Sequence, residues 1–278
     1  MSAASPELPP RAALARVPGL ESGAAPLRAE RLEGGLVNES WRIDTPRGRF
    51  VLRVDGPLSQ RPGVDRARER TLHDIAASAC IAPRALTWDA AAGIQVREFV
   101  DGRVWSEQDL QVAVQVRRLG GRLAQLHALE VPATVAPFDP DGFALQYLRS
   151  IEATGASIAL ASAVRAAVRS AAEIVAARGA RAVIVHGDLA CANLVDAGPA
   201  GERLMLLDWE YAQVADPVYD VACVLAYCAK ARPHAALLLQ AAGLAGDDAD
   251  RALDEAIRVY EGLTWLWLRA RGTGVRDR

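Results

Sequence analysis

The sequence predicts an α+β fold, in which a small antiparallel sheet with one helix precedes a larger, mostly helical part. Short runs of β-branched and aromatic residues, separated by turn residues, dominate roughly the first 100 residues. Apolar residues at helical spacing dominate most of the remainder. The 278 residues are 51% hydrophobic and 24% charged, which is typical of one large or two small globular domains and excludes a disordered or collagen-like chain.

The N-terminal region begins with a segment that has no strand or helix pattern. Residues 1–27 are rich in Ala, Pro and Ser, which is typical of a tail or of a short packed arm. From Leu32 apolar residues return, break at Gly34–Gly35 and resume, and residues 45–48 have the composition of a turn. Together with the β-branched and aromatic run at 49–54, this pattern predicts an antiparallel meander of strands.

One helix and two further strands complete the expected N-terminal unit. Apolar or small residues recur near helical spacing over residues 64–78, which predicts a helix. Residues 84–88 and 93–99 have the composition of strands. We therefore expect residues 28–100 to form one unit with a sheet and a single inserted helix.

The remaining residues, 101–278, are expected to be mostly helical. Apolar spacing predicts a long helix over 109–129. The pair Gly120–Gly121 within it lowers helix propensity, which the close approach of a neighbouring helix would explain. A second helix is expected at about 158–178, then two strand-and-loop stretches joined by a turn within 183–215, and helices again over the last 60 or so residues.

Composition excludes several classes of function. The net charge is −2, so the chain offers no excess of basic residues for nucleic acid or an anionic membrane. Lys230 is the only lysine and lies outside any glycine-rich loop, which excludes a P-loop NTPase. The chain does not open on a basic segment followed by an apolar one, and no apolar run approaches the ~20 residues of a membrane span. We therefore expect a soluble, cytoplasmic protein without nucleic-acid or membrane partners.

The cysteines indicate neither a zinc site nor a disulfide framework. No two of them have the two-residue gap of a zinc knuckle or a redox motif. We expect buried thiols in a reducing compartment. The four residues are Cys80, Cys191, Cys223 and Cys228.

One block of polar residues carries the chemistry. An apolar run leads into His186-Gly187-Asp188, Asn193 follows five residues later, and a second apolar run ends at Asp208. Carboxylate and amide oxygens suit a hard cation such as Mg²⁺. In phosphoryl transfer one acid orients the attacking hydroxyl and accepts its proton, while an amide and a second acid hold Mg²⁺ on the phosphates. Singly, each residue is also an ordinary turn or capping residue, so their combination carries the prediction.

The pattern HGDxxxxN followed by LDWE resembles the kinase-like phosphotransferases of small molecules. These are the aminoglycoside phosphotransferase, choline/ethanolamine kinase and thiamine kinase group, and the resemblance covers about residues 30–270. It implies a two-lobed, protein-kinase-like fold, with nucleotide bound by the N-terminal lobe and catalytic and substrate groups on the C-terminal lobe. It also implies ATP and Mg²⁺ as cofactors and a small-molecule alcohol as the phosphoryl acceptor.

The resemblance assigns a role to each residue of the polar block. It implies that Asp188 is the catalytic base and that Asn193 and Asp208 bind the metal. It further implies that His186 shapes the loop by packing and hydrogen bonding, and that Asp220 braces that loop.

In the N-terminal lobe, the family places a cation on the third strand to bind the nucleotide phosphates, and a helix glutamate to hold that cation. Arg53 stands at the cation's position in this sequence, and no lysine is available there. Arginine is physically suited to the role because it stays charged and binds phosphate oxygens in pairs. Glu69 is the best helix partner, although it could instead be a solvated acid paired with Arg66 or Arg70.

Two further segments are implied to bind the nucleotide. Gly35 and Asn38 match the loop over the phosphates, although the full glycine motif is absent. Glu98, Phe99 and Val100 match the segment between the lobes whose backbone groups bond the edge of adenine.

The acceptor is less defined than the chemistry. Aminoglycoside phosphotransferases typically have glycine two residues after the metal-binding aspartate; Glu210 stands there, so the resemblance favours a choline-, ethanolamine- or thiamine-type cationic alcohol. Trp265 and Trp267 could offer aromatic faces to a cation or form an ordinary helix stripe. Two alternatives remain, an aminoglycoside antibiotic phosphotransferase on the same fold and a non-catalytic, kinase-like nucleotide-binding protein. The sequence does not indicate an oligomeric state.

Overall fold

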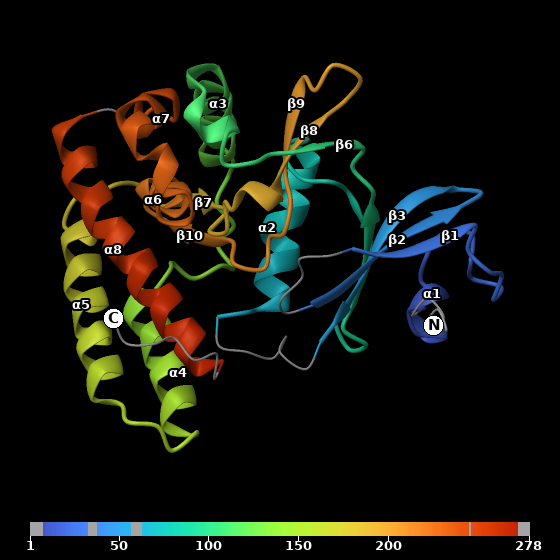
Figure 1. Cartoon of the computed structure of the whole chain (residues 1–278), viewed down its shortest axis with the longest axis horizontal. Helices are drawn as coiled ribbons and strands as arrows, with labels where there is room; N and C mark the ends of the chain where they lie inside the picture. Colours follow the sequence, from blue (N-terminus) through green and yellow to red (C-terminus); the bar gives the residue numbers. More distant parts are fainter. Residues whose placement is uncertain (1–7, 33–37, 57–62, 245, 272–278) are drawn as a thin grey trace, which may run out of the picture.

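The chain folds into a two-lobed α+β structure, as the sequence predicts (Figure 1). The computed structural model describes residues 8–32, 38–56, 63–244 and 246–271. An N-terminal sheet forms one end of the molecule, helices fill the other, and helix α2 lies between them in Figure 1. Gly35, expected in the phosphate loop, is outside the described residues.

The N-terminal sheet has five strands in the order β1-β2-β3-β5-β4, and every neighbouring pair is antiparallel. The predicted meander and the two later strands are therefore confirmed. Arg53 lies opposite Gln95, and Val51 lies opposite Arg97, in the pairing of β3 with β5. The strands are β1 (Arg28–Leu32), β2 (Asn38–Thr45), β3 (Gly48–Asp55), β4 (Ala85–Asp89) and β5 (Ile94–Glu98).

The two faces of this sheet differ in chemistry because alternate residues of a strand point to opposite sides. The outer face is apolar and forms a core with residues of the N-terminal arm, where helix α1 (Arg11–Leu14) begins. The arm is thus packed rather than a free tail, and each large side chain buried there contributes about 1.5–3 kcal/mol. This core contains Ala13, Val17, Leu20, Trp41, Ile43, Phe50, Leu52, Ile94 and Val96.

Helix α2 (Arg66–Ser78) confirms the helix predicted at 64–78. It begins at Asp65, whose carboxylate accepts hydrogen bonds from the backbone N–H groups of the first turn, a cap worth about 1 kcal/mol. Leu72 and Ala76 are fully buried and belong to the main core of the C-terminal lobe. Glu69 is buried on the same helix, so α2 links the main core to a charged position between the lobes.

The C-terminal lobe contains the predicted helices and the predicted hairpin, together with two elements that the sequence pattern did not indicate. The unexpected elements are strand β6, which pairs with β8, and helix α4. Its strands and α-helices are β6 (Gly102–Val104), α3 (Ala113–His127), α4 (Pro140–Glu152), α5 (Ala159–Ala176), β7 (Val183–Val185), β8 (Leu194–Ala197), β9 (Arg203–Leu206), β10 (Gln213–Ala215), α6 (Val218–Tyr227), α7 (Ala235–Ala241) and α8 (Asp247–Ala270). Short 3₁₀ helices lie at Asp109–Gln111, Cys191–Asn193 and Ala229–His234.

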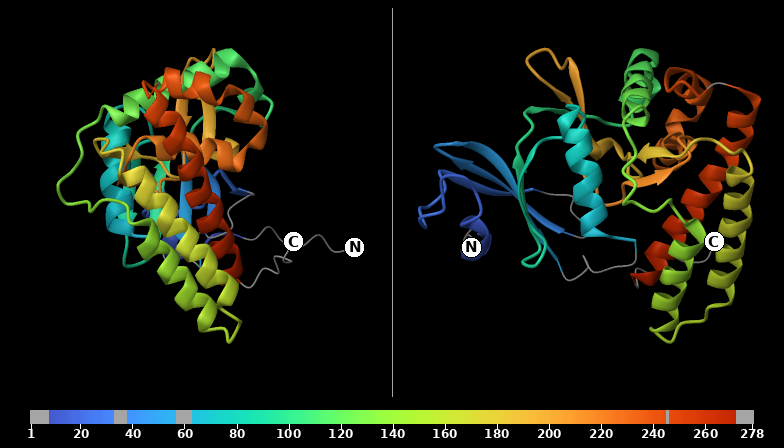
Figure 2. Two further views of the ribbon diagram at one scale, coloured as in Figure 1. Left: turned by 90° about the vertical axis from the view of Figure 1, so that its left-hand side faces the viewer. Right: turned by 180° about the vertical axis from the view of Figure 1, so that it is seen from behind.

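Glycine allows two close helix contacts in this lobe. A Cβ atom on Gly120 of α3 would lie 2.4 Å from the Cβ of Ala241, so the predicted close approach of a neighbouring helix is found. Gly121 has open space around its Cβ position. In the bundle of α4, α5 and α8 (Figure 2), a Cβ on Gly262 would lie 2.4 Å from Cγ2 of Val168.

The expectation of buried thiols is only partly met. Cys223 and Cys228 are buried and Cys191 is partly exposed, but Cys80 is exposed because it lies in the turn after α2 with a positive φ of 57°. All four are free. No helix in the described part of the chain combines the length and apolar character needed to cross a membrane.

Candidate active site

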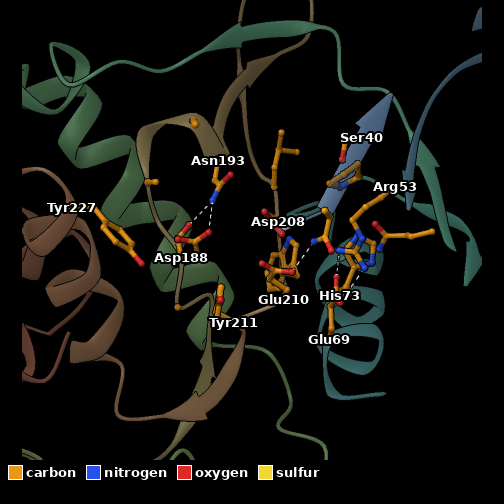
Figure 3. A pocket seen from close by; sticks show the side chains of 18 of the residues that line it. Ser40, Arg53, Glu69, His73, Asp188, Asn193, Asp208, Glu210, Tyr211 and Tyr227 are labelled. Carbon is orange, nitrogen blue, oxygen red and sulfur yellow. Dashed lines mark hydrogen bonds and ion pairs between the residues drawn. The ribbon is translucent and has the colours of Figure 1, made fainter. Parts of the chain in front are cut away.

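A cleft of about 650 Å³ lies between the lobes. The sheet face with Arg53 and Gln95, helix α2, the loops after β7 and β9, and helices α6 and α8 all contribute to its wall. Figure 3 shows that its charged side chains converge from both lobes. Most residues implied by the family resemblance are thus brought to one cavity.

The loop after β7 is held by Asp220 of helix α6. The fully buried carboxylate accepts hydrogen bonds from the backbone N–H groups of His186 (2.9 Å) and Gly187 (3.1 Å), and contacts Nε2 of His127 at 2.9 Å. Gly187 has a φ of +76°, and a Cβ there would lie 2.4 Å from the carbonyl oxygen of Tyr211. The loop therefore requires glycine at this position and a carboxylate behind it.

His186 connects this loop to the loop after β9. Its ring Nε2 lies 2.9 Å from the carbonyl oxygen of Leu207, and its Nδ1 accepts a hydrogen bond from the backbone N–H of Asp188. Because Nδ1 is an acceptor, the ring is neutral with its proton on Nε2. Burial lowers the pKa of His186, which agrees with a packing role against Trp209.

The carboxylate of Asp188 points into the cleft (Figure 3). Its Oδ2 accepts a hydrogen bond of 2.8 Å from Nδ2 of Asn193, and the Tyr227 hydroxyl lies near enough to help lower the pKa of Asp188. Burial and repulsion from Asp208 and Glu210 raise the pKa of Asp188 to about 7. A carboxylate with a pKa near neutrality is suited to accept a proton from a substrate hydroxyl.

Asp208 has the properties expected of a metal ligand. Its side chain is exposed in the cleft and makes no hydrogen bond or ion pair with any residue that the structure describes. Its backbone has a φ of +60°, an unusual conformation for a residue other than glycine. Nδ2 of Asn193 donates hydrogen bonds to Asp188. The side-chain carbonyl oxygen of Asn193, Oδ1, is therefore the atom that could bind a cation.

These two residues fit Mg²⁺, which typically takes one or two protein ligands and completes its shell with phosphate oxygens and water. No group of three His, Cys, Asp or Glu side chains in the described residues forms an all-protein metal cage. The donor set therefore fits a cation that arrives with a phosphate ligand.

Arg53 and Glu69 form the buried ion pair expected between β3 and α2. Nη1 and Nη2 of Arg53 donate to the two carboxylate oxygens at 2.5 and 3.2 Å, and the residues are 8% and 1% exposed. The attraction of Arg53 and Arg66 lowers the pKa of Glu69 although burial opposes it. The alternative of a solvated Glu69 is excluded by its burial, but Arg66 is indeed a second partner.

Arg66 belongs to a polar network that the sequence interpretation missed. Its Nη1 lies 2.6 Å from Glu69 and 3.3 Å from Glu210, and its Nη2 donates to Asn38 and to Asp55. Nδ2 of Asn38 donates to Glu210 at 2.9 Å. The network joins β2, β3 and α2 to the loop after β9, so it connects the two lobes.

This network changes the interpretation of two predicted residues. Glu210, expected to meet a substrate cation, is 3% exposed and already bound by Asn38 and Arg66. Burial and the nearby Asp208 raise its pKa to about 7. Asn38 lines the cleft, as expected, but its side-chain amide is committed to Arg66 and Glu210.

The segment between the lobes contributes Phe99 and Val100 to the cleft, but not Glu98. The carboxylate of Glu98 pairs with Arg84 outside the cleft, and its backbone N–H donates to the carbonyl of Arg84. The structure therefore does not present the side chain or the N–H of Glu98 to the cleft. Phe99 and Val100 line the cleft, but the N–H of Phe99 donates to the carbonyl of Arg49.

An aromatic wall faces the acids from the C-terminal lobe. Tyr211, Tyr227, Tyr260 and Trp267 line the cleft, whereas Trp265 does not. Residues two apart on a helix point in different directions, and Trp265 packs beside the main core under Arg269. Trp267 packs beside the main core as well, so Trp267 combines core packing with a place in the cleft lining, whereas Trp265 has the core packing only.

A family model described as the phosphotransferase enzyme family matches residues 28–255. The chain belongs to this family. A search of curated proteins gave no match. The predicted membership and the kinase-like fold are confirmed for this phosphotransferase.

Solved structures with the same fold include choline kinases and an antibiotic phosphotransferase. Choline kinase LicA from Streptococcus pneumoniae superposes with a TM-score of 0.76 at 21% identity, covering 93% of this chain and 90% of that one. A choline/ethanolamine kinase family protein from Mesorhizobium loti gives 0.70 at 25% identity, covering 96% and 87%. Spectinomycin phosphotransferase APH(9)-Ia, solved with ADP and spectinomycin, gives 0.58 at 14% identity, covering 90% and 87%.

Proposed function

We propose that this phosphotransferase transfers the γ-phosphoryl group of ATP, with Mg²⁺, to the hydroxyl of a small cationic alcohol of the choline, ethanolamine or thiamine type. The observation that supports this most is the Asp208 carboxylate, which pairs with none of the described residues and lies in the same cleft as Asp188 and Asn193, beside the Arg53–Glu69 pair. These groups together can bind a metal–nucleotide complex and a proton-donating acceptor.

The proposed chemistry is a direct transfer between two oxygens. The acceptor oxygen forms a bond to the γ-phosphorus as the bond from that phosphorus to the β,γ-bridging oxygen breaks, which releases ADP. The proton of the acceptor hydroxyl passes to the carboxylate of Asp188. Asp208 and the carbonyl oxygen of Asn193 would hold Mg²⁺, which neutralises phosphate charge when bound. Arg53, fixed by Glu69, binds phosphate oxygens.

The cationic class of acceptor is supported by the electrostatics of the cleft. Asp188, Asp208 and Glu210 lie close enough for their charges to raise the pKa values of Asp188 and Glu210, so a positive ligand is favoured there. The aromatic wall can add about 0.5–2 kcal/mol for a quaternary or thiazolium cation. A neutral sugar would not compensate the desolvation of these acids. The choline kinase names among the similar structures agree with this class.

In this proposal residues 28–100 are the nucleotide lobe and residues 101–278 the catalytic and acceptor lobe. Trp267 replaces the pair Trp265 and Trp267 as the helix α8 contribution to the acceptor site. A cytoplasmic location fits a reaction that consumes ATP.

ADP release by the purified protein tests the proposal. Mg-ATP is supplied with choline, ethanolamine, thiamine, spectinomycin or N-acetylglucosamine in separate reactions, and Asp188→Asn gives the background. We expect turnover with at least one cationic alcohol and none with the neutral sugar. Turnover of the sugar alone would contradict the acceptor class, and turnover of spectinomycin with resistance in a susceptible host would favour the antibiotic enzyme. Failure to bind any nucleotide would contradict the kinase assignment itself.

A further inference from the structure

Arg97 of strand β5 is a cleft residue that the family resemblance did not assign. Ile94 and Val96 of the same strand are buried in the apolar core of the outer sheet face. Alternation places Gln95 and Arg97 on the opposite face, and both line the cleft with Arg53. The same pattern is visible in the register, where Arg97 lies opposite Val51, another cleft residue.

The guanidinium of Arg97 has no partner in the described part of the chain. Its Nη1 is buried and makes no hydrogen bond, and the side chain takes part in no ion pair there. The other two arginines of this region are committed: Arg53 to Glu69, and Arg66 to Glu69 and Asp55. Among these three arginines, Arg97 is therefore the one that pairs with no carboxylate of the described residues.

Arg97 as a whole is half-buried, but its Nη1 is buried without a partner among the described residues, and such a charged donor is costly to the folded protein. Burial lowers the pKa of Arg97 to about 10, so the group is still charged at neutral pH. The charges that act on it most are those of Asp208, Arg53 and Glu69. The strand register agrees with this: Arg97 stands two residues along β5 from Gln95, the register partner of Arg53, so its side chain lines the same face of the cleft as the expected phosphate-binding pair.

We propose that Arg97 is a second phosphate-binding cation, whose free donors bind the polyphosphate of the donor nucleotide. The proposal rests on the proposed function, because it assumes a nucleotide in this cleft. It explains why the buried Nη1 of Arg97 has no partner among the described residues: its partner is an anionic oxygen of the ligand. The two arginines also differ in charge balance. Glu69 neutralises Arg53, whereas no described carboxylate forms an ion pair with Arg97.

Equilibrium binding of ADP and of adenosine separates this role from others. The test variant is Arg97→Met, with Arg97→Gln as a second variant should the first fold poorly. Arg47→Met is the matched control, because Arg47 is an exposed residue of the turn between β2 and β3. We expect Arg97→Met to weaken ADP binding about 10- to 100-fold, the range for hydrogen bonds to a charged group, and to leave adenosine binding within about 2-fold.

Thermal unfolding gives an independent test, because the Tm of the ligand-free protein and the rise in Tm on adding ADP should change in opposite directions. Removing an unpaired buried charge should raise the Tm of the ligand-free protein, while the rise in Tm on adding ADP should shrink. A lower Tm without ligand would instead indicate a structural role and overturn the proposal.

Two binding results would also overturn it. These are equal losses for ADP and adenosine, which would place Arg97 at the base, and unchanged ADP binding. A change in the preference between ATP and GTP with no change in the ADP-to-adenosine ratio would likewise assign Arg97 to the purine. If the unsubstituted protein binds neither ADP nor ATP, the proposed function fails, and that result is distinguishable from a failure of Arg97 alone.

Discussion

Glu69 lies between two arginines, Arg53 at 2.5 Å and Arg66 at 2.6 Å. Its carboxylate is almost fully buried, so both ion pairs are shielded from solvent. The acid that would orient the phosphate-binding Arg53 is therefore itself held by a second cation, which in turn reaches Glu210 of the other lobe.

The shared acid predicts an order of stabilities. Arg53→Met should lower the free energy of unfolding by about 1–3 kcal/mol, less than the usual cost of breaking a buried pair, because Arg66 still compensates Glu69. Glu69→Ala should cost more, about 3–5 kcal/mol, because it removes the close carboxylate partner of the buried Arg53 and one of the partners of Arg66. Urea unfolding of both variants measures this order. An equal loss in the two variants would mean that Arg66 does not share the charge.

The residues whose common place in the cleft could be predicted from the sequence are those held by local chain geometry. Asp188 and Asp208 follow the short strands β7 and β9, and Asn193 ends the 3₁₀ helix before β8, so a motif at fixed spacing places them without knowledge of distant contacts. The contacts of Arg66 with Asn38, Asp55 and Glu210 were missed because these partners come from three different elements. Arg97 had a signal, since apolar Ile94 and Val96 alternate with polar Gln95 and Arg97, but the direction of each face depends on the arm packed behind the sheet.

The two missed elements have different reasons. Helix α4 had a start signal, Asp139 followed by Pro140, and the Asp139 carboxylate does cap the helix at the N–H of Gly142. Strand β6 had none, because its three residues are exposed and its place depends on pairing with β8. Contacts between residues far apart in sequence thus explain the second omission but not the first.

The raised pKa of Asp188 predicts the pH dependence of the reaction. The base must be ionised, so kcat/KM, which reports the free enzyme, should fall below an apparent pKa of about 7. Repulsion from Asp208 contributes to that value, so a bound cation should move the corresponding pKa in kcat to lower pH. Asp188→Asn should lower turnover by about 10²-fold or more at every pH and leave nucleotide binding intact. A flat profile from pH 5 to 9 in the unsubstituted enzyme would contradict a titrating base.

The raised pKa of Asp188 also predicts that this residue lowers the free energy of unfolding as pH rises above about 4. The folded state holds a proton on Asp188 up to about pH 7, whereas the unfolded chain loses it near its ordinary value of 3.8. Between these values the folded state binds more protons, so the unfolding free energy decreases as pH rises from about 4 to 7. Asp188→Asn removes this slope and should stabilise the protein at pH 8 by about 2 kcal/mol, with little change at pH 4. Chemical denaturation at both pH values measures it; destabilisation at pH 8 would contradict the assignment.

The hydroxyl of Tyr227 predicts a positioning role for that residue. It lies near the Asp188 carboxylate and lowers the pKa of that group. Tyr227→Phe should shift the apparent pKa in kcat/KM to higher pH. It should also lower kcat by about 3- to 10-fold, the range expected when one polar interaction with a charged group is lost. Tyr219→Phe, on the same helix but outside the cleft lining, is the control. A loss of acceptor affinity with an unmoved pH profile would show that Tyr227 acts only on the acceptor.

The free carboxylate of Asp208 predicts how metal and nucleotide binding are linked. Asp208→Asn should abolish turnover and remove most of the dependence of ATP affinity on Mg²⁺, because the charged ligand of the cation is lost. Asn193→Ala should act differently, since Asn193 both holds Asp188 and offers its carbonyl oxygen to the cation. It should raise the Mg²⁺ concentration needed for half-maximal rate and also lower the rate at saturating Mg²⁺. Titrating ATP binding against Mg²⁺ for each variant distinguishes them, with Asp101→Asn as an exposed acid control. Mg²⁺ dependence that survives Asp208→Asn unchanged would place the cation on other ligands.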